Sequence, residues 1–114
     1  LGLARLYIFS GQPDKAIDIL QSTLQWYDGD HELSLYMGLA YAFKKDAPRA
    51  IEEFENSLKL NPNSLLAHYY LGVQVQNSDP SSSRRHLKIF LKLAGNQPEQ
   101  GGLIQKAEKL LKKF

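Results

Sequence analysis

Two kinds of feature are missing from this sequence of 114 residues, and each absence excludes a class of protein. There is no cysteine, which excludes disulfide bonds, thiol catalysis and cysteine–zinc sites. No uninterrupted apolar run approaches the roughly 18 residues that a membrane-spanning helix needs. Hydrophobic residues make up 43% and charged residues 23%, which is ordinary for a globular protein. Length and composition therefore fit one folded domain with a real core.

Motifs for catalysis or metal binding are also missing. His31, His68 and His86 have no partner at ligand spacing, and no glycine-rich phosphate loop occurs. The acidic residues of segment 28–32 lack the oxygen-ligand loop of an EF-hand, so we interpret them as a turn with an aspartate that caps the next helix. The serines of segment 77–83 have no histidine placed to activate them. We expect no enzyme, cofactor, metal site or small-molecule substrate.

A very small residue returns at a fixed interval, inside stretches whose apolar spacing is helical. Ala4, Gly38 and Gly72 stand 34 residues apart, although glycine costs a helix about 1 kcal/mol relative to alanine. The third unit fits this register if its turn is one residue shorter, so that Ser83 takes the place of Ala50. We expect the three small residues to mark close approaches between paired helices. Their expected partners are Ala16, Ala50 and Ser83.

Proline, glycine and aspartate separate the helical stretches and indicate where each begins and ends. No strand is predicted. The predicted helices span residues 1–10, 14–27, 31–44, 47–60, 64–77, 80–94 and 102–113.

The second unit resembles the tetratricopeptide repeat, a helix–turn–helix unit of 34 residues. The matching residues are Met37-Gly38, Tyr41, Ala50, Phe54 and Pro62, whereas the third unit keeps Leu71-Gly72 but has Val75, Ser83 and Leu87. The resemblance implies an all-α, right-handed superhelix in one domain, residues 1–114. Its parts would be repeats at about 1–30, 31–64 and 65–97 and a capping helix at 102–114. Because the chain starts inside a helical pattern and without methionine, we expect a piece of a longer protein.

The family resemblance implies a scaffold for protein–protein interaction, in which the first helix of each unit lines a concave groove. The groove is expected to be apolar and aromatic, which suits a hydrophobic peptide or an amphipathic helix. One branch of the family holds a carboxylate with a cationic clamp, but only Arg5 is cationic at the corresponding positions here. The alternatives are packing within the array and self-association into homo-oligomers. The partner-binding residues carried over by register are Arg5, Phe9, Leu35, Tyr36, Leu39, Phe43, Tyr69, Tyr70, Val73 and Gln76.

The C-terminal part of the chain is basic, with eight Lys/Arg against Glu99 and Glu108 in residues 84–114. We interpret these cations as a solvated outer face. Nucleic-acid binding through Arg84, Arg85, Lys88 and Lys92, and membrane-surface binding through residues 102–114, are alternatives that the sequence favours less. We expect the last helix to form a lid on the third unit. The apolar stripe of that lid consists of Leu103, Ile104, Ala107, Leu110, Leu111 and Phe114.

Overall fold

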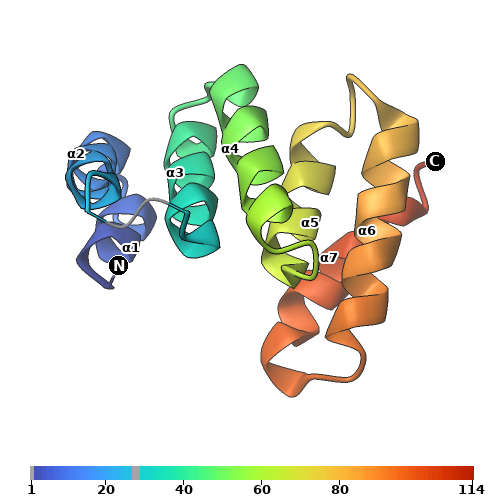
Figure 1. Ribbon diagram of the computed structural model, residues 1–114. Coiled ribbons are helices and arrows are strands. Elements are labelled where there is room, and N and C mark those ends of the chain that lie inside the picture. The colour runs from blue at the N-terminus through green and yellow to red at the C-terminus, as the bar shows by residue number, and fades with distance from the viewer. Residues whose placement is uncertain (1, 27–28) are drawn as a thin grey trace. The chain divides into compact units, whose positions relative to one another are not determined.

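The computed structural model describes residues 2–26 and 29–114, and every regular element in those ranges is a helix (Figure 1). The chain divides into two compact units, Leu1–Pro62 and Asn63–Phe114. The first unit contains α1 (Gly2–Phe9), α2 (Pro13–Leu24), α3 (His31–Phe43) and α4 (Ala47–Leu60). The second contains α5 (Leu65–Gln74), α6 (Pro80–Ala94), the 3₁₀ helix η1 (Pro98–Gln100) and α7 (Gly101–Leu111). The predicted all-α class is confirmed.

The helix boundaries follow the capping chemistry that the sequence predicts. Asp46 accepts a hydrogen bond from the Arg49 N–H at the start of α4, and Asp79 does the same for the Ser82 N–H at the start of α6. The prediction was less accurate at helix ends: α5 ends at Gln74 rather than at residue 77, and η1 was not predicted. The predictions for residues 1, 27 and 28 lie outside the described residues. Within the described ranges, no helix is long and apolar enough to cross a membrane.

In the first unit, α1 packs on α2 and α3 packs on α4, and α3 also contacts both α1 and α2. Figure 1 shows α3 and α4 running side by side as an antiparallel pair. Gly38 lies where this pair is closest, because a Cβ atom built on it would be 2.6 Å from Cδ1 and Cε1 of Phe54. The expected partner was Ala50. Ala50 is fully buried, but the tightest neighbour is the Phe54 ring, one helical turn further along α4.

In the second unit, Gly72 makes the equivalent approach between α5 and α6. A Cβ atom there would be 2.9 Å from Cγ of Leu87 and 3.3 Å from the carbonyl oxygen of Ser83. The Ser83 hydroxyl also donates a 2.6 Å hydrogen bond to the carbonyl oxygen of Gly72. Gly38 thus meets a residue 16 positions later and Gly72 one 15 positions later. The register is one residue shorter, as predicted, but the connection itself is not: residues 75–79 join α5 to α6, whereas residues 44–46 join α3 to α4.

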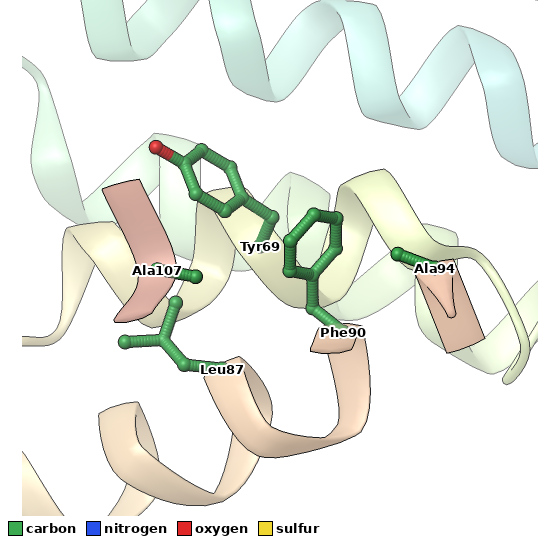
Figure 2. Packing of buried hydrophobic residues seen from close by; sticks show 5 residues of the cluster. All are labelled: Tyr69, Leu87, Phe90, Ala94 and Ala107. Atoms are coloured by element: carbon green, nitrogen blue, oxygen red, sulfur yellow. The ribbon is translucent and has the colours of Figure 1, made fainter. Parts of the chain in front are cut away.

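The core of the second unit joins α5, α6 and α7. Its buried residues are Tyr69, Leu87, Phe90, Ala94 and Ala107 (Figure 2). The rings of Tyr69 and Phe90 are 5.1 Å apart between centroids.

The expected lid is present, because α7 buries Ala107 in this core and packs most of its apolar stripe against it. One member of the predicted stripe was wrong. Phe114 lies beyond the end of α7 at Leu111, is 40% exposed and is not among the residues packed against this core.

Candidate functional site

The predicted partner-binding residues of the first unit fall into two groups. Leu35 and Leu39 are buried among neighbouring side chains, each 4% exposed. Phe9 and Phe43 are 56% and 48% exposed, and their rings meet edge to face with centroids 5.7 Å apart. This geometry is typical of a favourable aromatic pair. The aromatic pair is therefore accessible to solvent, whereas the two leucines mainly support the packing of α3.

Arg5 and Tyr36 complete the predicted set in the first unit. Arg5 is exposed on α1, and Tyr36 is half-buried on α3. The predicted groove position at residue 1 lies outside the described residues.

In the second unit, three of the predicted residues line one hollow between α5 and α7. Tyr69 and Val73 of α5, with Gln76 just beyond the end of that helix, form one wall, and the volume of the hollow is about 310 Å³. Tyr69 and Val73 stand at i and i+4, so they share one face of the helix. Tyr69 is only 5% exposed, and burial, with Tyr70 beside it, raises the pKa of its phenol. The floor of the hollow is therefore a neutral aromatic ring held from behind by the core. Figure 2 shows this ring beside Phe90 and Ala107.

Tyr70 stands next to this wall. Its ring meets that of Tyr69 edge to face with centroids 5.1 Å apart, and it is half-buried.

The opposite wall of the hollow was not predicted as part of a site. It consists of Leu110 with Lys106, Lys109 and Lys113, and all three lysines are exposed. From the sequence, these lysines are expected on the solvated face of the lid. Their spacing of i, i+3 and i+7 around Leu110 was a usable signal for a shared face. What the sequence could not give was the direction in which that face points once α7 docks.

Two of the three histidines, which have no partner at ligand spacing in the sequence, contact each other in the structure. His68 in α5 and His86 in α6 bring their Nδ1 atoms to 2.9 Å, a hydrogen bond in which one ring donates and the other accepts. The two residues are 18 positions apart in different helices, so the pairing of α5 with α6 brings their rings together. Burial, then the neighbouring His68 and Arg85, lower the pKa of His86 to about 4, against a weaker opposing effect of Asp79.

We expect this histidine pair to make the protein less stable in acid. An unfolded histidine has a pKa near 6.5, so the folded state binds fewer protons between pH 6.5 and 4. Stability present above pH 6.5 is thus lost as the pH falls through this window. The full difference would be worth about 3 kcal/mol, and about 1–2 kcal/mol is expected because the ring is partly solvated. Urea unfolding at pH 7, 5.5 and 4.5 measures it, and His86→Gln should flatten the slope; an unchanged slope would contradict this origin.

The remaining polar clusters do not form an alternative site. Asp30 accepts a 2.8 Å hydrogen bond from the Glu32 N–H, as expected for a helix cap, and Asp28 lies outside the described residues. In the described ranges, no three His, Asp or Glu side chains are placed to hold a metal ion. Arg84, Arg85, Lys88 and Lys92 are exposed on α6, but Phe90 of the same helix is fully buried. No exposed aromatic ring therefore accompanies these cations on α6.

The helix pairs α3–α4 and α5–α6, each with a glycine at a close approach, are typical of the tetratricopeptide-type fold. Comparison with solved structures shows this fold. The type III secretion chaperone SycD of Yersinia enterocolitica superposes with a TM-score of 0.88 over 98% of this chain and 86% of its own, at 17% identity. The TPR2B domain of yeast Sti1 gives 0.82 over 96% and 88%, at 14% identity. MamA gives 0.75 over 99% and 72%, at 21% identity.

No protein-family model and no curated protein matches this sequence. The likeness to solved structures therefore establishes the fold, and the function has to be argued from this chain's own surfaces.

Proposed function

We propose that this chain is a non-enzymatic scaffold that binds a hydrophobic peptide segment of a partner protein. The observation that carries the proposal is the hollow between α5 and α7, where the half-buried Val73 and Leu110 lie beside the buried ring of Tyr69. A rigid aromatic floor backed by a packed core is typical of an anchor site, since it loses little conformational entropy on binding. The exposed Phe9–Phe43 pair supplies a second apolar surface on the other unit.

The similar structures support the same direction. SycD was crystallised with a peptide of the translocator YopD, and the Sti1 domain with pHsp70. Both are proteins with this fold that hold a peptide or protein partner. For the present chain, this is support by analogy of fold. Its contact residues would be those of the ten predicted residues whose side chains are not buried.

The proposal is tested with a fluorescein-labelled peptide that carries a Leu/Phe core between neutral Ser/Gln flanks. Fluorescence anisotropy should show saturable binding to the wild type. Val73→Glu places a charged, hydrated carboxylate where the apolar core of the peptide would pack, and should weaken binding at least tenfold. The matched control is Leu6→Glu, which makes the same kind of change at a 63% exposed position of α1. Equal weakening by both variants, or no saturable binding, would contradict the proposal, provided that circular dichroism shows both variants folded.

Self-association is the second candidate, and one observation favours it. Leu3, Leu6 and Phe9 of α1 are 53%, 63% and 56% exposed, which leaves an apolar helix face uncovered in this chain. Light scattering over a concentration series tests it with the same Leu6→Glu variant. Self-association requires a mass that rises with concentration for the wild type and less for the variant.

A further inference from the structure

We propose that the hollow between α5 and α7 selects a peptide whose apolar anchor is flanked by carboxylates. This inference rests on the proposed function and names the chemistry of its partner. The hollow has two unlike parts: an apolar floor of Tyr69, Val73 and Leu110, and a cationic rim of three lysines, Lys106, Lys109 and Lys113. A ligand that satisfies both parts must be hydrophobic in the middle and acidic at its edges.

Among the described residues, no acidic side chain forms an ion pair with the lysines of the rim. In residues 2–26 and 29–114 the ion pairs are Lys44–Asp14 and Arg49–Asp46, and neither involves a lysine of the rim. The charge of the unit has the same sign, because residues 63–114 hold eight Lys/Arg and three Asp/Glu, a net charge of +5. The local field around the hollow therefore attracts anions and repels cationic flanks.

The spacing of the lysines indicates the size of the acidic segment. Lys106 and Lys113 are seven residues apart along α7 and the turn that follows it, or about 10 Å at 1.5 Å per residue. Two turns of a helical peptide, or about three extended residues, cover that length. An ammonium group is a hydrated point charge without the fixed fork of arginine. The rim should therefore accept several placements of Asp or Glu and should favour an acidic stretch over a single geometry.

The experiment uses three labelled peptides with one Leu/Phe core and flanks of Glu, of Ser/Gln or of Lys. At 50 mM NaCl we expect the Glu-flanked peptide to bind at least tenfold more tightly than the Lys-flanked one. At 500 mM NaCl the ratio should fall below about threefold, because the Debye length shortens to a few ångströms.

Two triple variants distinguish the effect of the rim lysines on peptide preference from the effect of net charge. Lys106→Gln/Lys109→Gln/Lys113→Gln should abolish the preference for the Glu flanks while leaving binding of the neutral peptide within about twofold. The control Arg84→Gln/Lys88→Gln/Lys92→Gln removes the same charge from exposed positions of α6 and should retain most of the preference. Equal loss in both triple variants would overturn the inference, because net charge alone would then explain the selectivity.

The outcomes also distinguish a failure of selectivity for acidic flanks from a failure of peptide binding itself. If the three peptides bind equally, the rim selects nothing and the inference fails while peptide binding stands. If none binds saturably, both fail. An anionic membrane is the competing occupant, so the wild type is also sedimented with phosphatidylcholine vesicles containing 30% phosphatidylserine. Lysine-dependent sedimentation without binding of the Glu-flanked peptide would overturn the inference in favour of a membrane surface.

Discussion

Replacing Gly38 by alanine should lower the free energy of unfolding by about 1–2 kcal/mol, and valine should lower it by about 3 kcal/mol. The added Cβ would lie 2.6 Å from two ring carbons of Phe54, closer than such atoms come in folded proteins. Phe54 is fully buried, so its ring cannot move without disturbing other packing. This steric cost exceeds the gain in helix propensity of about 1 kcal/mol that alanine offers over glycine.

Gly102→Ala is the matched control for Gly38→Ala. Gly102 also lies in a helix, but a Cβ atom there would meet nothing within 4 Å. This control should leave stability unchanged or raise it by up to about 1 kcal/mol. Urea unfolding monitored by circular dichroism measures both variants. Destabilisation of equal size at the two positions would mean that helix propensity, and not the approach of α3 to α4, governs Gly38.

A second variant identifies the contact responsible. Phe54→Leu creates at this position the pairing that Gly72 already makes with Leu87 in the second unit. If the ring causes the clash, Gly38→Ala should cost about 1 kcal/mol less in the Phe54→Leu background than in the wild type. Strict additivity of the two substitutions would show that the strain lies elsewhere.

Phe90→Ala should lower the free energy of unfolding by about 3–4 kcal/mol. Phe90 has no exposed surface and lies in the core that joins α5, α6 and α7, beside the ring of Tyr69. Its truncation removes contacts from all three helices, so we expect protection of the α7 amides against hydrogen exchange to fall most strongly. Phe114→Ala, at a residue that is 40% exposed, should cost less than about 0.5 kcal/mol. Similar losses for both phenylalanines would contradict this description of the core.

Local chemistry explains most of the fold that could be predicted from the sequence. Asp46 and Asp79 mark helix starts because their carboxylates cap free N–H groups, a contact made within three residues. The register of Gly38 and Gly72 was also readable, since a repeated small residue records a repeated close approach. The sequence did not predict which side chain lies closest to each glycine. Gly38 approaches Phe54 rather than Ala50, and the choice depends on how far one helix slides along the other.

The candidate site was harder to predict than the fold. Tyr69 and Val73 could be placed together because they share one face of α5, and Gln76 follows in the turn after that helix. Lys106 and the rest of its wall come from α7, about thirty residues further along the chain, and the side of the hollow that they occupy depends on tertiary docking. The His68–His86 contact was missed for the same reason, because the two rings are joined across a pair of helices.

The short distance in sequence between Gly38 and Phe54, and between Gly72 and Leu87, has a kinetic consequence. These tight contacts close loops of 16 and 15 residues, so little chain entropy is lost before packing begins. Proteins dominated by such local contacts fold in microseconds to milliseconds, well before slow searches for distant partners become limiting. Each helical pair can thus form largely on its own as the chain emerges during synthesis, without waiting for the residues that follow it.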